Sequence, residues 1–244
     1  MKDFFKILII GGFGGIIFLL GAFSLSYNYN FFGSARLLDQ IFPAREVQKI
    51  REEIITFVSE EEKAGTAIQK SRDSIVAIKS YRGGSLMRFG SGIVITQDGL
   101  IATVNQVVPQ NATNYQVFVG DKILNAEVVS RSVLRNLALL KIDIDSLRSA
   151  TFKEEGLEVG NVAFIIGKIA PLQKPELFVN RAFVSFIGSQ NNRIILDGRY
   201  EDYISGAGLV SGDGSFRGLV YIDGQRIIAL PSTFVEEFVK NYLK

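Results

Sequence analysis

The stretch Gly90 to Val108, GSGIVITQDGLIATVNQVV, decides the expected fold. Residues Ile93 to Thr96 have the composition and side-to-side alternation of a short strand. A turn signal follows at residues 97–99, and a second β-rich run covers Leu100 to Val104. The stretch therefore predicts a β-hairpin.

Short β-rich runs separated by Gly, Asp and Asn continue on both sides of this hairpin. One set of six lies between residues 74 and 147, and a second set lies between residues 157 and 230. The dipeptides Asp213-Gly214 and Asp223-Gly224 are typical of hairpin turns. The pattern predicts an all-β domain, residues 69–244, built from two six-stranded antiparallel barrels.

The C-terminal end has the pattern of a helix from Ser232 to Leu243. Thr233 and Glu236 have the spacing of a capping box that would open it. Its apolar face would comprise Phe234, Phe238, Val239 and Tyr242.

The N-terminal end has an apolar segment from Ile7 to Phe23. As a helix, Ile7 to Tyr27 would reach about 31 Å, which is the hydrocarbon thickness of a bilayer. We therefore expect residues 1–27 to form an uncleaved transmembrane helix, a single-pass membrane anchor. A cleaved signal peptide is the alternative, since Ala22-Phe23-Ser24 fits a small-x-small cleavage site.

The charges around this segment indicate its orientation. Lys2 and Lys6 precede it, whereas the first positive charge after it is Arg36. Positive charges favour the cytoplasmic side, so we expect the C-terminal domain on the extracytoplasmic side of the cell membrane.

Residues 28–43 form an expected juxtamembrane linker, and residues 44–68 have the pattern of an amphipathic helix. Its apolar stripe comprises Val47, Ile50, Ile54 and Phe57. Such a stripe either packs on its own globular domain or forms a short coiled coil that makes a homo-oligomer.

Composition excludes several kinds of site. Lys and Arg total 27 against 25 for Asp and Glu, which argues against a nucleic-acid partner because such proteins carry a clustered basic excess. The sequence has no Cys and no His, so it offers neither a thiolate nor an imidazole ligand. We expect no cofactor and no metal.

The Gly90 stretch resembles the first catalytic segment of trypsin-like serine proteases of the HtrA (Deg) type. The family pattern is G-S-G, three apolar or small residues, a D-G turn, and then T-x-N-H-V-V. The resemblance implies two barrels with an active site between them, and it puts Gln106 at the position of the catalytic His. Residues 135–142, RNLALLKI, resemble the family's T-D-L-A-L-L-K-I, which puts Asn136 at the position of the catalytic Asp.

Residues 203–209, YISGAGL, are the best match to the family's nucleophile segment, G-N-S-G-G-P-L. The resemblance implies that Ser205 occupies the nucleophile position. It also implies that Tyr203 replaces the Gly whose backbone N–H helps to form the oxyanion hole.

These replacements change the expected chemistry. A serine hydroxyl needs an adjacent base, and the amide of Gln106 is not one. Asn136 lacks the carboxylate that would orient an imidazole and stabilise imidazolium. We therefore expect a membrane-anchored pseudoprotease that binds a peptide or protein partner.

Two alternatives belong to other classes. One is a hydrolase in which another group, such as a lysine or the substrate, activates Ser205. The other is a purely structural subunit of an envelope complex.

Overall fold

A computed structural model describes residues 62–153, 157–171, 174–188, 193–199 and 201–244. The first six strands in these ranges are β1 (Ile75–Arg82), β2 (Ser85–Val94), β3 (Leu100–Val104), β4 (Asn114–Val119), β5 (Lys122–Ser132) and β6 (Leu137–Ile142). The second six are β7 (Val162–Ile169), β8 (Glu176–Ile187), β9 (Ile194–Gly198), β10 (Gly208–Val210), β11 (Phe216–Asp223) and β12 (Arg226–Pro231).

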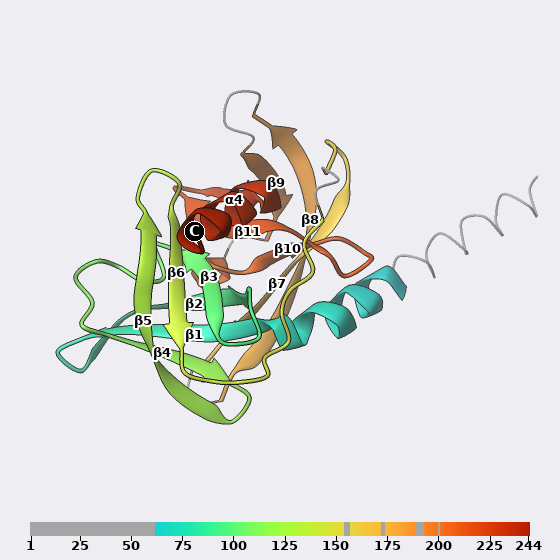
Figure 1. The fold of residues 1–244 in the computed structure, drawn as a ribbon. Coiled ribbons are helices and arrows are strands. Elements are labelled where there is room, and N and C mark those ends of the chain that lie inside the picture. Colours follow the sequence, from blue (N-terminus) through green and yellow to red (C-terminus); the bar gives the residue numbers. More distant parts are fainter. Residues whose placement is uncertain (1–61, 154–156, 172–173, 189–192, 200) are drawn as a thin grey trace, which may run out of the picture. The chain divides into compact units, whose positions relative to one another are not determined.

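Each set closes into an antiparallel barrel, as the sequence predicted. The strand orders are β1-β2-β3-β6-β5-β4 and β10-β11-β12-β9-β8-β7. Figure 1 shows the first set from cyan to yellow-green and the second from yellow to red. The predicted fold class is therefore confirmed for both barrels.

The predicted hairpin joins β2 to β3, with Ile93 paired to Ala102 and Val94 to Ile101. Gly99 in its turn has a φ of 97°, and a Cβ there would lie 2.4 Å from the carbonyl oxygen of Ile142. The turn therefore requires glycine on two grounds, backbone conformation and space.

The largest apolar cluster spans both barrels. It contains interior residues of the first barrel, such as Ile101 and Leu139, together with Phe164, Phe216 and Leu219 of the second. These five side chains are at most 7% exposed. The facing surfaces of the two barrels are therefore part of the core. Burying each large apolar side chain there stabilises the fold by about 1.5–3 kcal/mol.

Residues 62–71 are helical and lead through the 3-10 helix η2 (Arg72–Ser74) into β1. Ala67 is fully buried, and the Ser71 hydroxyl donates to the Ala67 carbonyl oxygen at 2.7 Å. The expected anchor, the linker and most of the expected 44–68 helix lie outside the described residues. Within the described residues, the helices lack the length and apolar character needed to cross a bilayer.

The C-terminal helix α4 (Ser232–Tyr242) confirms the predicted helix but not its cap. Pro231 is the N-cap residue, and no side chain caps the helix, so the Thr233/Glu236 capping box is wrong. The Ser232 hydroxyl instead donates to the Lys153 carbonyl oxygen at 3.1 Å. The helix buries Val235 and Val239.

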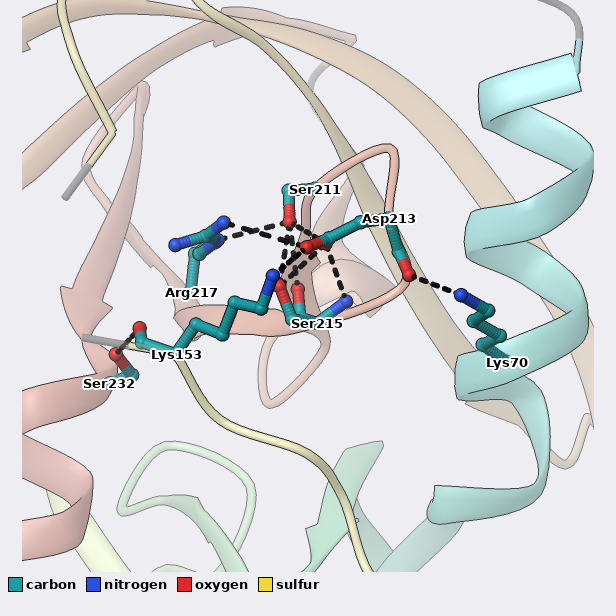
Figure 2. Close-up of polar contacts among 7 residues, drawn as sticks. All are labelled: Lys70, Lys153, Ser211, Asp213, Ser215, Arg217 and Ser232. Atoms are coloured by element: carbon teal, nitrogen blue, oxygen red, sulfur yellow. Dashed lines mark hydrogen bonds and ion pairs between the residues drawn. The ribbon is translucent and has the colours of Figure 1, made fainter. Parts of the chain in front are cut away.

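The loop between β10 and β11 is fixed by one carboxylate (Figure 2). Asp213 accepts hydrogen bonds from Lys153 Nζ at 2.6 Å and from the Ser211 and Ser215 hydroxyls, both also at 2.6 Å. Lys70 of the 62–71 helix donates to the Asp213 carbonyl oxygen at 3.2 Å. This Asp213 cluster joins the helix, the segment between the barrels and the second barrel.

The hydrogen bonds also change the ionisation of Asp213. Partial burial alone would raise its pKa, but the bonds from Lys153, Ser211 and Ser215 outweigh burial and hold the pKa of this carboxyl well below its usual range. Asp213 therefore stays charged in acid well below the pKa of a free aspartate.

Candidate active site

Ser205 follows the 3-10 helix η3 (Asp202–Ile204) and is only 7% exposed. The next residue, Gly206, has a φ of 82°, and a Cβ there would lie 2.0 Å from the Ser91 carbonyl oxygen. Only glycine fits this position, so Gly206 allows the segment to lie directly on β2 of the first barrel.

Ser91 holds this segment in place. Its N–H donates to the Ser205 carbonyl oxygen at 3.0 Å. Its hydroxyl donates to the Lys168 carbonyl oxygen at 2.9 Å and accepts from the Lys168 N–H at 3.0 Å. No local pattern in the sequence indicates that Ser91 connects β2 with two segments of the second barrel.

Gln106 follows β3, and its side chain contacts Ser205. The Ser205 hydroxyl donates to Gln106 Oε1 at 3.3 Å, and Gln106 Nε2 donates to the carbonyl oxygen of Ile222 at 2.6 Å. This orientation of the amide is required, because a carbonyl oxygen only accepts hydrogen bonds. Gln106 therefore connects the first barrel to two points of the second.

The backbone before Gln106 is fixed by its neighbour, Asn105. The Asn105 side chain donates to the Ser132 carbonyl oxygen at 2.8 Å and accepts from Arg131 at 2.8 Å. Arg131 also donates to the Val108 carbonyl oxygen at 2.6 Å. The segment carrying Gln106 is thereby held against β5.

Asn136 lies in the turn before β6 with a φ of 53°. Asparagine adopts this left-handed conformation more readily than most residues do. The Asn136 N–H donates to the Val133 carbonyl oxygen at 3.2 Å, and its carbonyl oxygen accepts from the Asn105 N–H at 3.3 Å. The structure thus brings Asn136 beside the residue before Gln106, and within the described residues no hydrogen bond joins its side chain to Gln106.

Tyr203 lies in the middle of η3. Its ring packs against Phe178 with the ring centres 4.9 Å apart and the planes at 73°, an edge-to-face contact. Tyr203, the residue at the glycine position of the family pattern, therefore packs its side chain on β8 of the second barrel.

A cavity of about 490 Å³ lies at Ser205. It is lined by Met87, Arg88, Phe89, Gln106, Asp202, Ser205 and Ile222. The sequence identified only Gln106 and Ser205 among these residues. Met87 to Phe89 directly precede the G-S-G motif, which is the one local signal that they lie nearby.

The charged groups of this cavity are Arg88 and Asp202. Two lysines with shifted pKa values lie elsewhere. Burial lowers the pKa of Lys79, whose ammonium group lies over the Phe118 ring. Burial also lowers the pKa of Lys168; the charge of Asp73 opposes this shift, and the charge of Arg72 adds to it. Neither lysine is among the lining residues. Within the described ranges, no three His, Cys, Asp or Glu side chains gather as a metal site would require.

The geometry can therefore hold the Ser205 hydroxyl and offers it an amide oxygen. An amide oxygen accepts a hydrogen bond but does not remove the proton, so this pair alone does not generate an alkoxide nucleophile.

Comparison with known proteins agrees with the fold. The crystal structure of the serine endoprotease from Yersinia pestis matches with a TM-score of 0.65 and 22% sequence identity, over 73% of this chain and 65% of that chain. This chain thus spans slightly less than two thirds of the length of that endoprotease, and the similarity is one of fold. No curated protein sequence matches the chain.

The trypsin-like peptidase domain family matches residues 90–219. The matched region begins at the G-S-G motif and includes Gln106, Asn136, Tyr203 and Ser205, the four positions that the resemblance singled out. It covers more than half of the chain and most of both barrels. The chain belongs to the trypsin-like peptidase domain family.

Proposed function

We propose that this protein is a catalytically inactive member of its family, a pseudoprotease of the HtrA type. The observation that carries the proposal is the contact between Ser205 Oγ and Gln106 Oε1 at 3.3 Å. The place where a base would take the serine proton holds an amide. A base and its orienting carboxylate together account for roughly a millionfold in turnover in another serine protease, so their absence leaves little activity.

Labelling by a fluorophosphonate tests the proposal. Without a base, Ser205 keeps an ordinary hydroxyl, so purified protein should be labelled no faster than the Ser205→Ala variant. Rapid labelling that depends on Ser205 would show an active hydrolase instead.

Restoration tests whether the barrels still hold the segments as an active enzyme does. Gln106→His with Asn136→Asp should produce slow labelling at Ser205. Adding Tyr203→Gly should accelerate it, because an oxyanion donor contributes about 2.7–4 kcal/mol where it has been measured. Absence of labelling in a folded triple variant would mean that the frame no longer supports the reaction.

The second candidate is a hydrolase with an unconventional base. Asp202 lines the same cavity as Ser205 and is the carboxylate among its lining residues. If the wild-type protein is labelled, Asp202→Asn should abolish the reaction when Asp202 is the base and leave it unchanged when it is not.

We further propose that the cavity at Ser205, here called the cleft, binds a peptide or protein partner outside the cytoplasm. Two features support this: the cavity at Ser205, and the apolar segment from Ile7 to Phe23 with lysines before it. The full chain should fractionate with membranes and resist extraction at alkaline pH. A protein recovered in soluble form and beginning near Leu25 would mean that the segment is a cleaved signal peptide.

Self-association is a separate proposal. The stripe that includes Ile50 and Ile54 would form a short coiled coil between copies of the chain. Replacing both residues by Asp should then lower the mass of the assembly while the barrels remain folded. Loss of barrel stability at unchanged mass would mean that the stripe packs on its own domain.

A further inference from the structure

Beside Ser205, the end of β11 extends beyond its partner β10 and leaves a short open strand edge on the otherwise closed second barrel. β11 pairs with β10 as far as Leu219, and the segment before β10 continues the pairing: Val220 donates to the Ala207 carbonyl oxygen and accepts from the Gly206 N–H, both at 2.8 Å. Among the described strands, none continues along this edge beyond Val220.

Ile222 presents its backbone to the same open edge. Backbone groups alternate along a strand with a period of two, so the N–H and C=O of Ile222 point to the side where those of Val220 are paired. The opposite edge of the strand is covered by β12, where Ile222 lies across from Ile227. An unpaired strand edge is a template for another extended segment.

Gln106 occupies this edge. Its Nε2 donates to the Ile222 carbonyl oxygen at 2.6 Å, while its Oε1 accepts from Ser205. A primary amide offers a donor and an acceptor, as a peptide group does, so the side chain imitates the next peptide group of a neighbouring strand.

We propose that Gln106 is a latch on the open edge of β11, which an extended polypeptide must displace in order to pair with Ile222. This inference rests on the proposed peptide-binding function of the cleft. The latch reaches from the first barrel, and its own backbone is fixed through Asn105, so only the side chain has to move.

Gln106 can be displaced because both of its hydrogen bonds are neutral, and a peptide group can replace the one to Ile222. Gln106 is exposed, and its contact with Ser205 is long for a hydrogen bond to a hydroxyl, at 3.3 Å. An incoming backbone N–H would replace the lost bond to Ile222. The cavity beside this edge carries Met87 and Phe89, which suit an apolar side chain of the bound segment.

Binding of an unfolded polypeptide tests the latch. Fluorescein-labelled β-casein serves as the probe, and its affinity is measured by fluorescence anisotropy for the wild type and for Gln106→Ala. Removing one neutral hydrogen bond that competes with the ligand should tighten binding roughly three- to tenfold. Gln106→Glu keeps the side-chain length but lacks the donor, so it should tighten binding as well.

Gln110→Ala is the matched control, because Gln110 is an exposed glutamine of the same segment that does not line the cavity. Its affinity should equal that of the wild type. In NMR spectra, the Gln106 side-chain N–H₂ signals should shift to the position of a solvated glutamine when β-casein is added.

The outcomes separate the latch from the binding function. Equal binding by wild type and Gln106→Ala, or weaker binding by the variant, would overturn the latch and leave the cleft as a binding site. No binding by any variant would overturn both.

Discussion

In the cleft, Gln106 makes two neutral hydrogen bonds, to Ser205 and to the backbone of Ile222. In the β10–β11 loop, Asp213 is a charged acceptor for Lys153 and for two serines, and its backbone accepts from Lys70. Both sites join segments that are 60 to 143 residues apart in the chain. The family pattern of the sequence pointed to the site at Gln106, whereas more hydrogen bonds converge on Asp213.

The difference indicates what each site contributes. Hydrogen bonds to a charged group are worth about 1.5–3 kcal/mol, and neutral ones about 0.5–1.5 kcal/mol. We therefore expect the Asp213 cluster to stabilise the fold and the cleft contact to be exchangeable. Replacements at both sites test this contrast.

The largest loss of stability is expected at Gly206, where the backbone after Ser205 lies against β2 without room for a side chain. Gly206→Ala would place a Cβ 2.0 Å from the Ser91 carbonyl oxygen at a positive φ. Strain and overpacking together should lower the free energy of unfolding by about 2–5 kcal/mol in urea titrations.

Gly120→Ala is its control, since Gly120 also has a positive φ but a Cβ added there would meet no atom within 4 Å. That change should cost about 1–2 kcal/mol, the conformational part alone. Equal losses of unfolding free energy in the two variants would show that the backbone at Ser91 moves away from an added Cβ without cost.

The next largest effect is expected at Asp213. Asp213→Asn removes the charge that Lys153 and the two serines contact, and the side chain is 39% exposed, so solvent screens part of the loss. The free energy of unfolding should fall by about 1–2 kcal/mol at neutral pH. Asp121→Asn, in the exposed turn between β4 and β5, should change it very little; a loss as large as that at Asp213 would contradict the contrast.

Acid should remove the Asp213 contribution. Its pKa is depressed in the folded protein, so the stabilisation is present above the ordinary aspartate pKa of about 3.9 and is lost progressively as the pH falls below that value. The difference in unfolding free energy between wild type and Asp213→Asn should therefore shrink between about pH 5 and pH 2. A difference that grows toward acid would mean that the carboxylate is not held in its charged form.

The smallest effect is expected at Gln106. Gln106→Ala removes two neutral hydrogen bonds from an exposed side chain and should lower the free energy of unfolding by less than about 1 kcal/mol. A loss larger than that of Asp213→Asn would reverse the comparison and make Gln106 a structural clamp. Urea titrations of both variants under one set of conditions decide this.

The sequence by itself determined the twelve strands and their turns. Alternation of apolar residues and the Asp-Gly dipeptides are local signals, and pairs such as Ile93 with Ala102 and Asp223 with Arg226 follow directly from them. The family pattern also singled out Gln106 and Ser205, whose side chains are in contact although 99 residues separate them.

Tertiary structure alone decided what surrounds that pair. Ser91 reaches Ser205, and Ile222 reaches Gln106, because the barrels pack face to face, and no local pattern encodes contacts between residues so far apart in the chain. The same reason applies at the start of α4, where the Ser232 hydroxyl donates to the carbonyl oxygen of Lys153 and no capping box forms. Local sequence fixes which backbone is extended or helical, whereas the partners of side chains at the boundaries depend on how the two barrels pack.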